Sequence, residues 1–237
     1  MIDRLEPTRR PQEPVWGYQN WRQLLFLHWQ VPLEALRPLV PEALSLDVYE
    51  GAAYVGVVPF VMRDIRPRWL PAAAAFNFLE TNVRTYVHLN GRPGVYFFSL
   101  DASSRLAVWA ARYGWGLPYH HARMTIEEAA GEMRYDSVRS TGPRHTAAYR
   151  VGESLGPTDP ESLEFFLLER YLLFVSRRER VYVGQVHHTP YPAQQVELLE
   201  VHDELIRAAG LEQPAVHPCF AHYASGVDVE IFALKPV

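Results

Sequence analysis

Polar residues alternate along the segment FLETNVRTYV, residues 78–87. In a β-strand, alternate side chains share one face, so Glu80, Asn82, Arg84 and Tyr86 are predicted to point the same way. Such a row can be a solvated strand face, or it can line the interior of a barrel. In an interior, arginine binds carboxylates in a bidentate manner, and Glu80 could anchor Arg84 or act as a base.

A second polar cluster, PYHH, follows two glycines at residues 118–121. Pro118 favours extended geometry before it, so a strand is predicted to begin here, with Tyr119 and His121 on one face and His120 on the other. Two adjacent rings on opposite faces cannot enter one pocket, and no HExxH or CxxC motif occurs. We therefore expect no metal site, and strand-end hydrogen bonding is the simpler role for each histidine.

Lysine is almost absent from the chain, because Lys235 near the C-terminus is the only one. A GC-rich genome is sufficient to explain this bias toward arginine. Whatever its cause, it leaves no interior lysine nucleophile unless the C-terminal tail folds inward.

The bulk composition narrows the class of protein. The net charge of −4 and the lack of a basic stripe argue against a nucleic-acid partner. The single cysteine excludes an internal disulfide and fits a cytoplasmic protein. No apolar run of 18 residues and no signal peptide are found, so no membrane association is expected.

Strand patterns dominate the chain, with short helices between them. Hairpin turns are predicted at Asn90-Gly91 and near Gly131, and a helix is predicted over 104–114, ending at Gly114. A longer helix is predicted from Asp159 through the apolar run FFLLERYLLFV. Many strands at short spacing predict a mainly β (α+β) fold, a closed or nearly closed antiparallel barrel. We expect a single domain over 1–237, with an extended lead-in over 1–15.

Six motifs in order resemble the domain-of-unknown-function 2071 family of uncharacterised bacterial proteins. These are FLHW, ETNVRTYV with PGVYFFSLDA, GLPYHHARM, LERYLLF, HHTPYP and YASGVDVEIF, spread from Trp16 to Phe232. That family has no established activity, so the resemblance implies a fold more than a function.

A more distant resemblance is to acetoacetate decarboxylase, through the segment ALRPLVPEALSLD. It implies an antiparallel acetoacetate decarboxylase-like β-barrel with a few flanking helices. It places Arg22 at the pocket arginine of that enzyme and Glu80 at its active-site glutamate. Tyr119 and His120 stand where the enzyme has two lysines, the first of which forms the Schiff base. Imine chemistry is therefore not expected.

Together these observations predict a pocket that binds a small carboxylate or oxo-acid, without a cofactor or a metal. The ligand-binding candidates are Arg22, Asn82, Arg84 and Tyr86, and the catalytic candidates are Glu80, Tyr119 and His121. We expect Arg84 and Glu80 to be buried and within hydrogen-bond reach of each other or of Asn82, since a buried charge without a partner is costly.

Two alternatives stay open at this point. The chain could be a lysine-independent acid/base enzyme, of lyase or hydrolase type, acting on a keto-acid-like substrate. It could also be a structural protein whose barrel is filled with side chains. The sequence leaves assembly into a homo-oligomer open.

Overall fold

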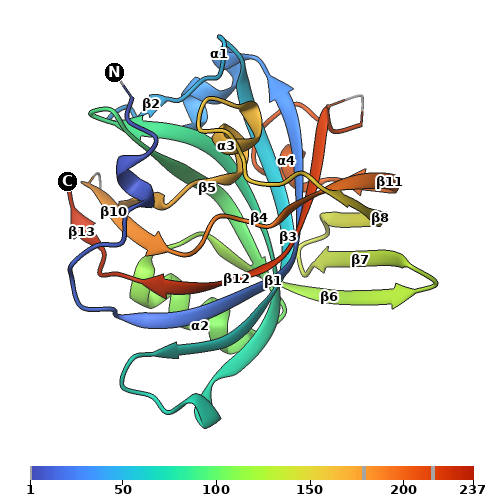
Figure 1. Ribbon diagram of the computed structural model, residues 1–237, viewed down its shortest axis with the longest axis horizontal. Coiled ribbons are helices and arrows are strands. Elements are labelled where there is room, and N and C mark those ends of the chain that lie inside the picture. The colour runs from blue at the N-terminus through green and yellow to red at the C-terminus, as the bar shows by residue number, and fades with distance from the viewer. Residues whose placement is uncertain (1, 178–179, 215–216) are drawn as a thin grey trace.

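Strands make up most of the protein in the computed structural model, which describes residues 2–177, 180–214 and 217–237 (Figure 1). The strands are β1 (Gly17–Val31), β2 (Ser45–Leu46), β3 (Ala53–Pro67), β4 (Phe76–Leu89), β5 (Arg92–Ala102), β6 (Tyr119–Ala129), β7 (Glu132–Arg139), β8 (Arg144–Ser154), β9 (Leu172–Arg177), β10 (Arg180–His187), β11 (Ala193–Asp203), β12 (Phe220–Ile231) and β13 (Lys235–Pro236). The helices are α1 (Leu33–Leu36), α2 (Arg105–Trp115), α3 (Leu163–Leu168) and α4 (Leu205–Ala208), with 3-10 turns η1 (Glu6–Thr8), η2 (Arg37–Leu39) and η3 (Ala72–Ala74). The mainly β class is confirmed.

The described strands form one 13-stranded sheet whose pairings return on themselves. The first ring runs β5–β9–β10–β12–β1–β3–β4 and closes because β4 pairs with β5. The second ring runs from β5 through β6, β7, β8 and β11 to β12, and shares β12, β1, β3, β4 and β5 with the first. Most pairings are antiparallel, while β5 pairs in parallel with β6 and β9. In Figure 1 the strands particular to the second ring extend to the right.

The shared strand β4 separates the two interiors by simple alternation. Val83, on its odd-numbered face, belongs to the apolar cluster of the second ring, together with Leu25, Met133 and Tyr149. Thr81, on the same face, donates a hydrogen bond to the Tyr135 hydroxyl of β7 at 3.2 Å. The even-numbered face therefore looks into the first ring, as the alternation of FLETNVRTYV predicted.

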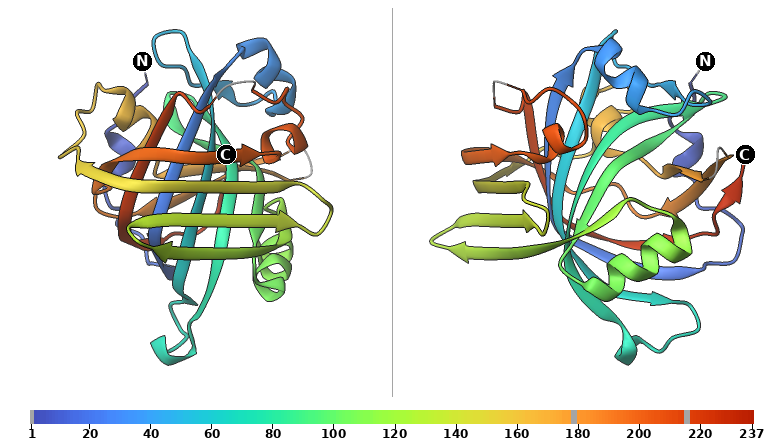
Figure 2. Two further views of the ribbon diagram at one scale, coloured as in Figure 1. Left: turned by 90° about the vertical axis from the view of Figure 1, so that its right-hand side faces the viewer. Right: turned by 180° about the vertical axis from the view of Figure 1, so that it is seen from behind.

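The helix α2 lies along the first ring, as the view from behind shows (Figure 2, right). Ser104 caps it by accepting a hydrogen bond from the Ala107 amide at 3.2 Å. It ends at Gly116, whose φ of 63° is in the left-handed region, two residues beyond the predicted end at Gly114. The hairpin turns at Asn90-Gly91 and Gly131 are confirmed.

The predicted helix from Asp159 through residue 175 is wrong over its second half. Ser162, not Asp159, caps α3, which ends after Leu168, and residues 172–177 form strand β9. The run FFLLERYLLFV is apolar on every face because both of these elements are buried. Periodicity alone cannot separate a buried helix from a buried strand in such a run.

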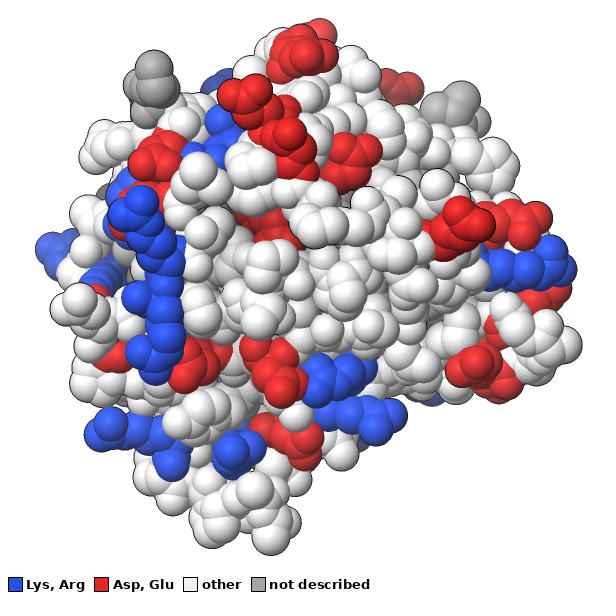
Figure 3. All heavy atoms as spheres, viewed as in Figure 1, with Lys and Arg blue, Asp and Glu red and all other residues white. Residues whose placement is uncertain are grey.

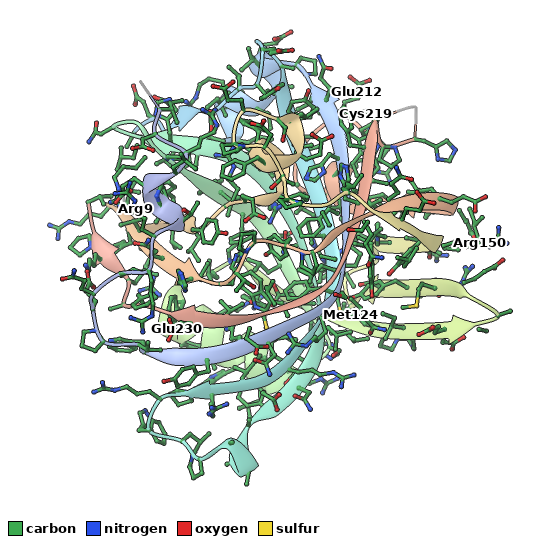
Figure 4. The ribbon with its side chains drawn as sticks, in the orientation of Figure 1. Arg9, Met124, Arg150, Glu212, Cys219 and Glu230 are labelled. Atoms are coloured by element: carbon green, nitrogen blue, oxygen red, sulfur yellow. The ribbon has the colours of Figure 1, made fainter. Side chains whose placement is uncertain are left out.

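The N-terminal segment contacts the first ring. Gln185 donates to the Pro7 carbonyl at 3.1 Å, and Arg10 pairs with Glu230 of β12 at 2.5 Å. Figure 4 labels Arg9 and Glu230 on this same side of the molecule. The described part of the predicted lead-in, residues 2–15, thus contacts β10 and β12, and it contains the turn η1.

The charged side chains on the face shown in Figure 3 lie mainly around its edge, where acidic and basic groups are neighbours. No helix among the described residues combines the length and the apolar character needed to cross a membrane.

Candidate functional site

A cavity of about 260 Å³ lies inside the first ring. A single water molecule needs only roughly 10–15 Å³ of such space. The first ring is therefore not filled by its side chains, which argues against a purely structural barrel. The polar groups that line it are Gln19, Glu80, Asn82, Arg84, Tyr119, Arg170, Tyr171, Gln185 and Tyr191. The large apolar groups that line it include Trp21, Phe26, Phe60, Met62, Phe76, Phe78, Phe97 and Trp115.

Arg84 is a buried cation that faces this cavity, with 7% of its surface exposed. Its Nη2 donates to the Leu167 carbonyl at 3.0 Å, and its Nε has no hydrogen-bond partner. The guanidinium carbon lies 5.5 Å from the ring centre of Phe26. No Asp or Glu of the described residues forms an ion pair with Arg84. A cation held in this way favours an anionic ligand.

Glu80 and Arg84 are both buried, as expected, but Glu80 forms no hydrogen bond with Arg84 or with Asn82, so that part of the expectation is wrong. The Oε2 atom of Glu80 accepts a hydrogen bond from the Tyr119 hydroxyl at 2.7 Å instead. Burial raises the pKa of Glu80 to about 8, and the Tyr119 bond offsets only part of that rise. Glu80 is therefore mostly protonated at neutral pH. In this neutral form it cannot balance the charge of Arg84.

Asn82 lies between Glu80 and Arg84 on the same face of β4. It is buried, lines the cavity, and its Oδ1 has no hydrogen-bond partner. An amide with free hydrogen-bonding capacity beside a guanidinium can hold a ligand oxygen or hydroxyl. The predicted binding role of Asn82 is compatible with this position.

Arg170 is a second cavity-lining arginine, and unlike Arg84 it has an ion-pair partner, which it shares with Arg4. Its Nη1 donates to Asp47 Oδ2 at 2.7 Å, and its Nε donates to the Phe166 carbonyl at 2.6 Å. Asp47 also accepts from Arg4 at 2.5 Å. The motif LERYLLF contains Arg170, but nothing in its pattern assigns this residue to a pocket.

Glu169, its neighbour, fixes two tyrosines of the cavity wall. Its Oε2 accepts from the Tyr171 hydroxyl at 2.6 Å, and its Oε1 accepts from the Tyr191 amide at 2.9 Å. Burial raises the pKa of Glu169, while both hydrogen bonds oppose that rise. Tyr171 and Tyr191 are functional candidates that sequence reasoning missed. The contact of Tyr191 with Glu169 joins residues 22 positions apart.

Arg22 lies outside the cavity, contrary to the position implied by the decarboxylase resemblance. Its guanidinium pairs with the exposed Asp228 and donates to the Val227 carbonyl at 2.7 Å. Leu24 and Phe26 line the cavity, so regular alternation would also turn Arg22 inward. A bulge at Gln23, with φ of 51°, breaks that alternation and turns Trp21 inward instead.

Of the PYHH segment, only Tyr119 reaches the cavity, and its predicted inward orientation is confirmed. His121 lies beyond it, with Nδ1 3.1 Å from the Ser140 hydroxyl. His120 is on the opposite face, as predicted, and burial lowers its pKa to about 4. Strand β6 pairs with β5 over three residues, of which Tyr119 is the first and His121 is the last.

Tyr86 shares the inward face of β4 but lies past the end of the cavity. Its hydroxyl donates to the Leu167 carbonyl at 2.8 Å and lies 2.7 Å from Nε2 of the buried His28. Its predicted direct contact with a ligand is not supported by this position. Tyr86 instead shares its carbonyl partner with Arg84.

Lys235 lies in β13 and is paired with Glu13 at the surface, outside the cavity. Among the described residues, no group of three or more His, Cys, Asp or Glu is arranged to hold a metal ion.

Comparison with known proteins identifies the family of this chain and proteins that share its fold. Residues 18–228 match the domain-of-unknown-function 2071 family, described as an uncharacterized conserved protein. The chain belongs to this family. It is 39% identical over 220 residues to the uncharacterized protein YqjF of Bacillus subtilis (strain 168), covering 92% of this chain and 90% of YqjF.

Solved structures of low sequence identity share the fold of this family member. The enduracididine biosynthesis enzyme MppR complexed with pyruvate matches with a TM-score of 0.67 and 13% identity, over 96% of this chain and 93% of MppR. Acetoacetate decarboxylase from Legionella pneumophila matches with a TM-score of 0.65 and 14% identity, over 98% and 92% of the two chains. The chain therefore has an acetoacetate decarboxylase-like fold, as the resemblance implied.

Proposed function

We propose that the protein binds a small carboxylate or 2-oxo acid in the cavity of the first ring. The observation that carries this proposal is Arg84, a buried guanidinium with an unpartnered Nε that faces the cavity and has no ion pair among the described residues. A ligand carboxylate would supply the missing anion. The pyruvate in the MppR complex supports the same ligand class for this fold.

Binding by this arrangement needs no lysine. Arg84 would hold the carboxylate, Asn82 would accept or donate a hydrogen bond beside it, and the neutral Glu80 with Tyr119 would contact the next part of the ligand. Lysine-dependent imine formation is not part of this proposal, because the only lysine is exposed in β13.

A second candidate function is an acid/base reaction on a bound oxo-acid. The raised pKa of Glu80, about 8, favours this candidate, because a protonated carboxyl at neutral pH can give a proton to a carbonyl or enolate oxygen. Tyr119, which is hydrogen-bonded to Glu80 at 2.7 Å, would orient that proton.

Isothermal titration calorimetry with pyruvate and 2-oxooctanoate tests the proposal. The variant Arg84→Met is expected to weaken binding by roughly 10- to 150-fold, the range for losing a hydrogen bond to a charged group. Arg22→Met is the matched control, since Arg22 lies outside the cavity, and it should bind as the wild type does.

Two results would contradict the proposal. One is that neither acid binds the wild type at millimolar concentration. The other is that Arg22→Met and Arg84→Met weaken binding equally, which would place the anion site elsewhere. Circular dichroism spectra of both variants confirm that each is folded.

A further inference from the structure

We infer that the natural ligand is an amphipathic carboxylate, with its acid group at Arg84 and an apolar tail, aromatic or aliphatic, that extends toward the mouth of the cavity. This inference rests on the proposed function and specifies the class of ligand. It follows from where the polar and apolar groups lie along the cavity wall.

Strand β4 shows the division most directly. Its inward residues run, in order, Phe76, Phe78, Glu80, Asn82 and Arg84. Since a strand rises roughly 3.3 Å per residue, Arg84 and Phe76 are roughly 26 Å apart along it. The polar half is buried, while Phe76 is half-exposed, so polarity falls from the inside of the cavity toward its mouth.

The neighbouring strand β3 presents an apolar wall along the same length. It presents Val58, Phe60, Met62 and Ile65 to the cavity, without a polar side chain among them. Buried Phe60 pairs directly with Glu80 in the sheet, and Met62 pairs with Phe78. The apolar wall therefore begins beside Asn82, at Val58, and continues outward past Glu80.

The strand β1 and the helix α2 complete the outer half of the cavity. Trp21, turned inward by the bulge at Gln23, makes an edge contact with Phe60 at 6.0 Å. From α2, Ala110, Ala111 and Trp115 face the same space. Two small side chains next to large aromatic ones leave room for a chain or a ring.

A three-carbon acid held at Arg84 would leave this outer half unused. The strand positions of Arg84 and Glu80 alone are roughly 13 Å apart. A polar tail would lose its hydration against these aromatic walls without gaining hydrogen bonds, whereas an apolar tail gains from burial. An apolar tail is therefore the one that the cavity selects.

A homologous series of 2-oxo acids from pyruvate to 2-oxooctanoate, with phenylpyruvate added, tests the inference by calorimetry. Each methylene that enters the apolar half should tighten binding by up to about four-fold, which corresponds to about 0.8 kcal/mol per buried methylene. Octan-1-ol, which lacks the carboxylate, should bind much more weakly than octanoate, and Arg84→Met should remove that difference.

Two variants on α2 locate the tail. Ala111→Phe fills the outer half and should weaken 2-oxooctanoate roughly ten-fold or more, while leaving pyruvate nearly unchanged. Leu106→Phe is the matched control, because Leu106 is on the exposed face of the same helix, outside the cavity, and it should change neither affinity.

The outcomes separate this inference from the proposal beneath it. Pyruvate and 2-oxooctanoate binding equally well would overturn the apolar tail and leave carboxylate binding intact. Failure of every acid in the series would overturn both. Octan-1-ol binding as tightly as octanoate would show an apolar pocket with no role for the acid group, and would also overturn the inference.

Discussion

Arg84 is buried in a position that suits ligand binding, and its guanidinium loses hydration there without gaining an ion pair from the described residues. A buried cation without an anion lowers the free energy of unfolding, and such strain is common at binding sites. The Leu167 carbonyl accepts from both Arg84 and the Tyr86 hydroxyl, so it keeps one donor if Arg84 is replaced.

Arg84→Met is therefore expected to melt, without ligand, at the wild-type temperature or above it. The methionine keeps the apolar packing against Phe26 and removes the charge. Differential scanning calorimetry checks this, and a melting temperature lower by several degrees would show that Arg84 serves the fold rather than a ligand.

The raised pKa of Glu80 makes the free energy of unfolding depend on pH. Its pKa in the folded protein, about 8, is above its ordinary value of 4.5, so the folded state keeps a proton that the unfolded state releases between these limits. Its contribution is fully present below about pH 4.5 and is lost as the pH rises toward 8, by at most about 1.4 kcal/mol per pH unit.

The variant Glu80→Gln removes this dependence. Its free energy of unfolding, measured with urea, should therefore rise relative to that of the wild type as the pH increases from 5 to 8. Tyr119→Phe removes the hydrogen bond that lowers the Glu80 pKa, so the decline should extend to higher pH. Parallel pH profiles for wild type and Glu80→Gln would mean that Glu80 is ionised across this range.

At the scale of residues, alternation was enough to predict that Glu80, Asn82 and Arg84 share one face, and the decarboxylase resemblance placed Tyr119 inside the barrel. The same resemblance failed for Arg22, because a single bulged residue in β1 reverses which side chains point inward. Tyr171 and Tyr191 were beyond reach, since their positions depend on Glu169, whose burial only the folded chain reveals.

At the scale of elements, the bulge in β1 decides which side chain enters the cavity. Opposite it, Gly226 of β12 has φ of 150°, and a Cβ there would overlap the Trp21 carbonyl oxygen. The close approach of the two strands therefore requires glycine.

Gly226→Ala is expected to destabilise the protein by about 1–3 kcal/mol, the cost of a strained backbone position. Gly114→Ala is the control, because Gly114 lies in α2 with open space around it and should be neutral or stabilising by up to about 1 kcal/mol. Urea denaturation measures both, and equal effects would contradict the account of the bulge.

Hairpins were predictable from local turn chemistry, as at Asn90-Gly91, where both residues have positive φ. The region 159–177 was not, because α3 and β9 are both buried and carry no alternation between apolar and polar residues. Tertiary burial, rather than local propensity, decides where that helix gives way to a strand.

At the scale of the molecule, two rings share five strands. The first contains the cavity described here, while the second contains an apolar cluster and the buried ion pair of Arg139 with Asp101. The strand patterns predicted a barrel. The division into two rings was not predictable, because it depends on which strands pair at β5 and β12.

The lysine content of the whole chain leads to a further prediction, that no Schiff base forms in the cavity. Incubation with pyruvate or acetoacetate and borohydride should give no covalent adduct inside the cavity, because no lysine lines it. Intact mass measurement and peptide mapping check this, and the N-terminal amine and Lys235 serve as internal references. An adduct on any cavity residue would contradict the prediction.

The most direct test of the central claim is a crystal structure of the protein grown with 2-oxooctanoate. The carboxylate is expected within about 2.7–2.9 Å of the Arg84 guanidinium, with the alkyl chain pointing past Glu80 toward Phe60. A ligand carboxylate bound away from Arg84, or a ligand outside the first ring, would contradict the claim.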